Sequence, residues 1–144
     1  MARTILIAGA VASLVSGIGG VVFAALGAVA LERVLPPLAI DTDALRGAIV
    51  ALAAAMLLVS LLHAAIIVGL RFGWRLAWTA GVLLAVVLAT MFVALAAASG
   101  TSAIADPDRA VAYLAGVIGA VVGALAYGFV AARLLGEMRS GFVI

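Results

Sequence analysis

Long runs of apolar residues, separated by short polar segments, make up most of the chain. A helix needs about 20 mainly apolar residues to cross a hydrocarbon core of about 30 Å. Stretches of that length cover approximately residues 4–31, 44–70, 76–98 and 110–135. None alternates like a barrel strand, and lipid offers no partner to an unpaired backbone group. The pattern predicts an all-α membrane protein, a single domain over residues 1–144 that forms an antiparallel bundle of four transmembrane helices.

The segments between the predicted spans carry residues that end and begin helices. Pro36 and Pro37 cannot continue a helix, and residues 41–43 offer side-chain oxygens to cap the second span. Asp106 is the expected N-cap of the fourth span, with Pro107 at its first position. If the two loops met, their aspartates could instead bind a cation. These aspartates are Asp41, Asp43, Asp106 and Asp108. Capping is the simpler interpretation.

The charged residues lie at the span ends and indicate an orientation. The two termini and the second loop hold Arg3, Arg71, Arg75, Arg133, Arg139 and one acid, Glu137. The first and third loops hold Arg33, Arg46, Arg109 and the acids Glu32, Asp41, Asp43, Asp106 and Asp108. Short loops rich in arginine stay in the cytoplasm, so we expect both termini there, in a bacterial inner membrane. Arg71, Trp74, Arg75 and Trp78 are the expected membrane-interface anchors.

Small residues form stripes along the first and last predicted spans. Because lipid tails are as apolar as leucine, membrane helices associate through close packing of small side chains. The expected packing positions are Ser16, Gly20 and Ala24 in the first span and Gly116, Gly119, Gly123 and Gly128 in the fourth. The economical interpretation packs these two spans against each other. The rival interpretation gives one stripe to a second copy or to another membrane protein.

His63 is the one ionisable side chain that the pattern places deep in a span, and Ser60 lies one turn away. Such a residue is a functional hypothesis by default, for proton relay or metal binding. The simpler interpretation is a neutral imidazole hydrogen-bonded to Ser60 or to Tyr or Thr of a neighbouring helix. Further hydroxyl groups that could form a polar seam belong to Ser13, Ser16, Thr79, Thr90, Tyr113 and Tyr127. Tyr127 shares a helix face with Gly123, which favours packing.

Composition narrows the chemistry available to the chain. Of the 144 residues 69% are hydrophobic and 10% are charged, and the sequence contains no Cys, Lys, Asn or Gln. No nucleophile with a base and no pair of carboxylates can be named, so we expect no enzymatic activity, no cofactor and no metal site. The net charge of +2 comes from scattered arginines rather than a patch, which disfavours nucleic acid as a partner.

Two segments resemble a group of known proteins. The second loop reads Gly-Leu-Arg-Phe-Gly-Trp-Arg-Leu-Ala-Trp over residues 69–78, and the last span is followed by Leu-Leu-Gly-Glu-Met-Arg-Ser-Gly-Phe over residues 134–142. Both are similar to segments of uncharacterised small four-span membrane proteins of high-GC bacteria. This resemblance implies the four-span topology and assigns no active residue.

The sequence therefore favours a small membrane protein without chemistry of its own. By elimination, we expect an accessory or assembly subunit of a larger membrane complex, in contact with lipid and with other subunits or itself. The alternative is a small oligomeric transporter or channel that uses His63 and the Ser/Thr seam. A weaker alternative is a helper that presents His63 to a cofactor held by its partner.

Overall fold

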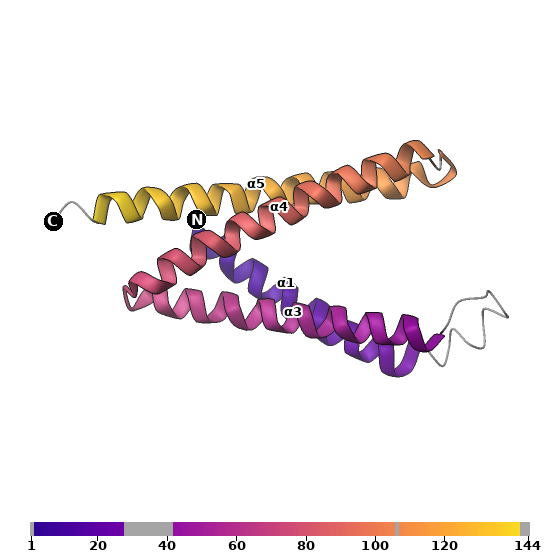
Figure 1. Cartoon of the computed structure of the whole chain (residues 1–144), viewed down its shortest axis with the longest axis horizontal. Helices are drawn as coiled ribbons and strands as arrows, with labels where there is room; N and C mark the ends of the chain where they lie inside the picture. Colours follow the sequence, from indigo (N-terminus) through magenta and orange to yellow (C-terminus); the bar gives the residue numbers. More distant parts are fainter. Residues whose placement is uncertain (1, 28–41, 106, 142–144) are drawn as a thin grey trace. The chain divides into compact units, whose positions relative to one another are not determined.

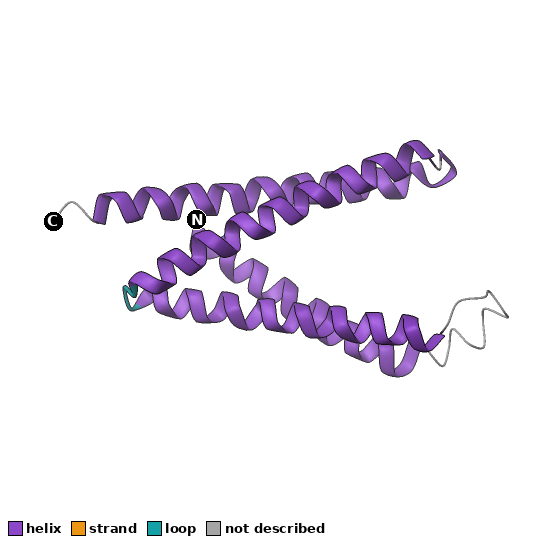
Figure 2. Ribbon diagram, viewed as in Figure 1, coloured by secondary structure: helices purple, strands orange, loops and turns teal. Residues whose placement is uncertain are grey.

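The structure is a computed structural model that describes residues 2–27, 42–105 and 107–141. Its long helices are α1 (Ala2–Val22), α3 (Thr42–Arg71), α4 (Arg75–Ala105) and α5 (Ala110–Gly141). A π-helical turn, η1 (Phe23–Gly27), continues α1, and a short 3₁₀ helix, η2 (Pro107–Arg109), precedes α5. Figure 2 shows that helix accounts for the described chain apart from the turn between α3 and α4.

The fold class predicted from the sequence is confirmed. Four helices of the described chain are long and apolar enough to cross a membrane: Ala2–Ala25, Arg46–Arg71, Arg75–Ala105 and Ala110–Ser140. Each pairs its backbone groups within itself, as hydrocarbon requires. The protein is an all-α, four-helix, multi-pass membrane protein.

The chain divides into two compact units. The N-terminal unit is Leu6–Ala65, which contains most of α1 and of α3. The C-terminal unit combines Met1–Ile5 with Ile66–Ile144 and contains the end of α3 together with α4 and α5. The prediction of a single domain over the whole chain stays a prediction.

Helices α4 and α5 form the body of the C-terminal unit and run antiparallel. Figure 1 shows them side by side, joined through η2. Facing positions are Ser99 with Gly116, Phe92 with Gly123, and Gly81 with Leu134. Residue numbers thus fall along one helix as they rise along the other, so the start of α4 lies level with the end of α5. Buried residues along the pair include Leu84, Ala85, Ala120, Val130 and Ala131.

The third and fourth helices are longer than the sequence predicts. The predicted third span ends near residue 98, whereas α4 continues to Ala105. Hydroxyl groups beyond the predicted end of the span bond to the helix itself: Thr101 and Ser102 donate to the Ala98 carbonyl at 2.8 and 3.0 Å. Helix α5 likewise extends to Gly141. Side chains that satisfy local carbonyls let the helices project past the apolar run.

Several residues predicted to begin or end helices are not among the residues that the structure describes. Pro36, Pro37, Asp41 and Asp106 are outside the described residues, as is the predicted end of the first span near residue 31. Pro107 opens η2 rather than the first turn of α5. A proline there costs no hydrogen bond, because the first N–H groups of a helix have no partner within it.

A tight turn joins α3 to α4, in the short segment between the second and third predicted spans. Trp74 N–H donates to the Gly69 carbonyl at 2.9 Å, and Gly73 N–H donates to the Leu70 carbonyl at 3.4 Å. These bonds form a Schellman motif, in which the residue after the helix adopts a left-handed conformation. Gly73 has φ +71°, which a Cβ would disfavour. Gly69 is needed for another reason, since a Cβ there would lie 2.5 Å from the Ala77 Cβ.

We predict that Gly73→Ala lowers the free energy of unfolding by about 1 kcal/mol, because alanine disfavours the left-handed conformation. The matched control is Gly136→Ala, in α5, where a Cβ meets nothing within 4 Å among the described residues. Alanine in a helix interior should stabilise by about 0.5–1 kcal/mol. Unfolding by SDS titration measures both. A Gly73→Ala protein as stable as the control would contradict the turn assignment.

Candidate functional site

Ser60 links the two helices of the N-terminal unit. Its side chain is 8% exposed, and its Oγ donates a hydrogen bond of 2.9 Å to the backbone carbonyl of Ala10 in α1. A hydroxyl carries a single proton, so this bond uses the only one that Ser60 can donate. Ser60 is therefore a contact between spans, and it cannot donate to His63 at the same time.

His63 is fully buried on α3, one turn after Ser60. Its Nδ1 lies 2.8 Å from the Val59 carbonyl oxygen of the preceding turn. Because a carbonyl only accepts, Nδ1 must carry the proton in this bond. The expected partner was Ser60, or Tyr or Thr of a neighbouring helix, and the structure adds a backbone partner on His63's own helix. This bond fixes the orientation of the ring.

The two threonines of the candidate hydroxyl seam that lie in α4 form hydrogen bonds to their own helix. Thr79 donates to the Arg75 carbonyl at 3.5 Å and Thr90 to the Val86 carbonyl at 2.9 Å, and both bonds are exposed. Hydroxyl groups in membrane helices commonly bond to the preceding turn in this way.

Tyr127 belongs to an aromatic contact in the C-terminal unit. Its ring stacks on Phe92 of α4, with centroids 6.0 Å apart and an interplanar angle of 18°. Gly123 makes room for this pair, because a Cβ there would lie 2.8 Å from the Phe92 ring. The packing interpretation of Tyr127 agrees with this contact.

The small residues of the first span meet the second span in the N-terminal unit. A Cβ on Gly20 would lie 2.9 Å from the Ala53 Cβ, and one on Gly17 would lie 2.7 Å from Leu57. Ala24 is buried at 3% exposure, whereas Ser16 is exposed. Gly17 and Gly20 therefore lie against α3. The predicted packing of the first span on the fourth stays a prediction. A small-residue stripe marks close approach without naming the helix that approaches.

The glycines of the fourth span divide into two sets. Gly116 faces Ser99, with 3.3 Å from a built Cβ to its Oγ, and Gly123 faces Phe92, so both lie against α4. Gly119 and Gly128 have no neighbour within 4 Å of such a Cβ among the described residues. The sequence pattern could not separate these sets, because both fit the same spacing.

Sequence reasoning also missed close contacts at Gly69 and Gly81. A Cβ on Gly81 would lie 2.9 Å from Leu134 and 3.2 Å from Ile66. Gly69 and Gly81 are isolated glycines within long helices, where glycine is unfavourable and therefore suggests a packing reason. That signal was present in the sequence.

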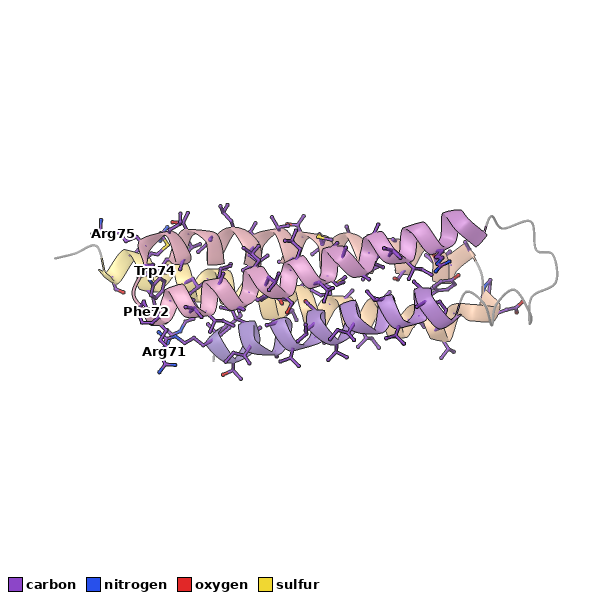
Figure 3. The ribbon with its side chains drawn as sticks, turned by 90° about the horizontal axis from the view of Figure 1, so that it is seen from below. Arg71, Phe72, Trp74 and Arg75 are labelled. Atoms are coloured by element: carbon purple, nitrogen blue, oxygen red, sulfur yellow. The ribbon has the colours of Figure 1, made fainter. Side chains whose placement is uncertain are left out.

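The expected interface anchors gather at the α3–α4 turn. Trp74 is 58% exposed and Phe72, its neighbour, is 68% exposed. Arg71 and Arg75 are also exposed, and Trp78 is half-buried. Figure 3 shows the two arginines at the edges of the turn with the aromatic rings between them. This arrangement suits the headgroup region, where amphipathic rings and arginines are stable.

The described residues contain no group of three or more His, Cys, Asp and Glu side chains that could hold a metal ion. The cation site suggested for the loop aspartates falls mostly outside this description. Only Asp108 among them has a described side chain, and it is exposed. The expectations of no metal, no cofactor and no catalysis stay predictions.

Comparisons of the chain with protein-family models, curated proteins and solved structures found no match. The resemblance to small four-span proteins of high-GC bacteria therefore stays a prediction that rests on residues 69–78 and 134–142.

We predict that Ser60→Ala lowers the free energy of unfolding by about 0.6 kcal/mol, the average worth of a hydrogen bond between membrane helices. Ser140→Ala is the matched control, because the Ser140 Oγ bonds to the Gly136 carbonyl of its own helix at 3.2 Å. SDS titration of the two proteins measures the difference. Equal stability of the two variants would show that the Ser60 bond does not hold α1 to α3.

Proposed function

We propose that this small multi-pass membrane protein is an accessory or assembly subunit of a larger membrane complex, without catalytic chemistry of its own. Its place is the bacterial inner membrane, with both termini in the cytoplasm. Its partners are lipid and either another membrane protein or a second copy. One observation carries the proposal: Gly119 lies on a face of α5 that the other described residues of the C-terminal unit leave uncovered.

This face, which we term the Gly119 face, consists of Ala112, Ala115 and Gly119. Spacings of three and four residues place them on one side of a helix, and each is exposed. The neighbouring row of Gly116 and Gly123 is already occupied by α4. Helix α5 thus has one row of small residues that packs against α4 and a second row that no described residue of the C-terminal unit covers.

An exposed row of small residues packs better against another helix than against lipid. Small side chains let two backbones approach closely, which adds van der Waals contact where no hydrophobic drive exists. Large side chains such as Leu114, Ile118 and Leu125 of the same helix are exposed and can meet acyl chains instead. We therefore assign the Gly119 face to a partner helix.

The orientation is supported by the arrangement of charge in the C-terminal unit. Antiparallel packing of α4 and α5 puts the α3–α4 turn and the end of α5 at the same end. Arg71, Arg75 and Arg139 lie there. Arginine-rich short segments remain on the cytoplasmic side.

The transporter alternative depends on His63. Because His63 is fully buried, truncation to alanine would open a cavity and confuse function with folding. His63→Gln retains polarity and much of the volume, so it is the better variant. A transporter would lose flux in His63→Gln, whereas an accessory subunit would keep its assembly.

We predict that Gly119→Leu removes a co-purifying partner while leaving the fold intact. The full-length protein is extracted in mild detergent, and native mass spectrometry identifies what migrates with it. A Cβ at position 119 meets nothing within 4 Å among the described residues. Leucine there should not lower stability, because glycine is the poorer helix former by about 1 kcal/mol. The partner should therefore be lost without unfolding.

Two controls bracket this experiment. In the control Gly136→Leu, the Cβ likewise meets nothing within 4 Å among the described residues, and position 136 lies outside the Gly119 face, so the partner should stay. Gly20→Leu clashes with Ala53 and should weaken the N-terminal unit itself. A partner that survives Gly119→Leu would contradict the proposal, and a lone chain that loses flux in His63→Gln would favour transport.

A further inference from the structure

The α3–α4 turn exposes an aromatic pair on the surface of the C-terminal unit. Phe72 and Trp74 stack on each other, with ring centroids 6.1 Å apart and an interplanar angle of 28°. Both rings are more than half exposed. Arg71 ends α3 and Arg75 begins α4, so a cation flanks the pair on each side. Figure 3 shows this sequence of side chains around the turn.

The end of α5 brings a further cation to the same level. Gly81 of α4 faces Leu134 of α5, and the helices run antiparallel. Gly81 is six positions after Arg75, and Arg139 is five positions after Leu134. At about 1.5 Å per residue these distances along the helices are nearly equal, so Arg75 and Arg139 reach the same depth. We call this region the basic end: Arg71, Phe72, Trp74, Arg75 and Arg139.

The charges of Arg71 and Arg139 at the basic end are not balanced by an ion pair among the described residues. Among the described residues at the end of α3, the start of α4 and the end of α5, the one carboxylate side chain is that of Glu137. Its Oε1 lies 3.8 Å from Nε of Arg133. That pair leaves the charge of Arg71 and Arg139 in excess. Guanidinium groups bind phosphate oxygens in two-point geometry, and aromatic rings favour the adjacent interface.

We propose that the basic end binds the headgroups of anionic phospholipids. In a spanning helix hairpin, the exposed rings place this end in the headgroup layer, where phosphate is the abundant anion. A net anionic lipid neutralises the arginines, whereas the amine of a zwitterionic lipid is repelled by them. Binding therefore selects lipids by charge. The inference does not depend on the accessory role or on the Gly119 face.

The test uses the full-length protein in micelles that contain equimolar phosphatidylglycerol and phosphatidylcholine with the same acyl chains. Native mass spectrometry counts the lipids that stay bound. We expect phosphatidylglycerol to be retained over phosphatidylcholine, and Arg71→Gln to lower this ratio about fivefold, the usual effect of one basic residue at a membrane surface. Arg139→Gln should act in the same direction.

The matched control is Arg46→Gln, which removes one exposed arginine near the other end of α3. Its lipid ratio should equal that of the unaltered protein. An equal fall in Arg46→Gln would mean that net charge alone governs binding and would overturn the proposal. Equal retention of the two lipids would also overturn it, as would complete displacement of the bound lipid by millimolar inorganic phosphate. Circular dichroism of Arg71→Gln confirms that the helices persist.

Discussion

The hydrocarbon interior has no hydrogen-bonding partner to offer, and this constraint determines the architecture. Every backbone N–H and C=O group in a span must be satisfied by the chain itself. The described residues are accordingly helical except at the α3–α4 turn, and that turn satisfies its own groups through the bonds of Trp74 and Gly73. Even Ser60 and His63 bond to backbone carbonyls. Buried polar side chains are thus paired with backbone carbonyls, in their own helix for His63 and in the neighbouring helix for Ser60.

Shape rather than hydrophobicity then determines which helices meet. Apolar side chains gain nothing from water exclusion in lipid, so contacts form where backbones come close. Gly20 admits Ala53 in the N-terminal unit, and Gly123 admits the Phe92 ring in the C-terminal unit. The glycines that remain uncovered within the C-terminal unit, above all Gly119, are the positions at which a further helix could pack in the same way.

Apolar runs long enough to span predict all four helices, and Gly73 in a short turn predicts the α3–α4 connection. Hydropathy could not predict that α4 continues to Ala105. The polar residues there extend the helix because their hydroxyl groups bond to the preceding turn, as that of Ser102 does. Nor could spacing assign partners: within the N-terminal unit the stripe containing Gly20 meets α3, and the spacing of small residues does not name that helix. His63 stood out as the one ionisable residue deep in a span, but its bond to Val59 depends on side-chain geometry that a sequence does not contain.

Site-directed labelling tests the central claim, that α4 and α5 cross the membrane as an antiparallel pair. The chain has no cysteine, so each introduced thiol is unique. Phe72→Cys, Ser140→Cys and Thr101→Cys all replace exposed residues. With a membrane-impermeant maleimide on spheroplasts, we expect Thr101→Cys to react from outside and the other two to react only after permeabilisation. Labelling of Thr101→Cys from the same side as Ser140→Cys would contradict the account.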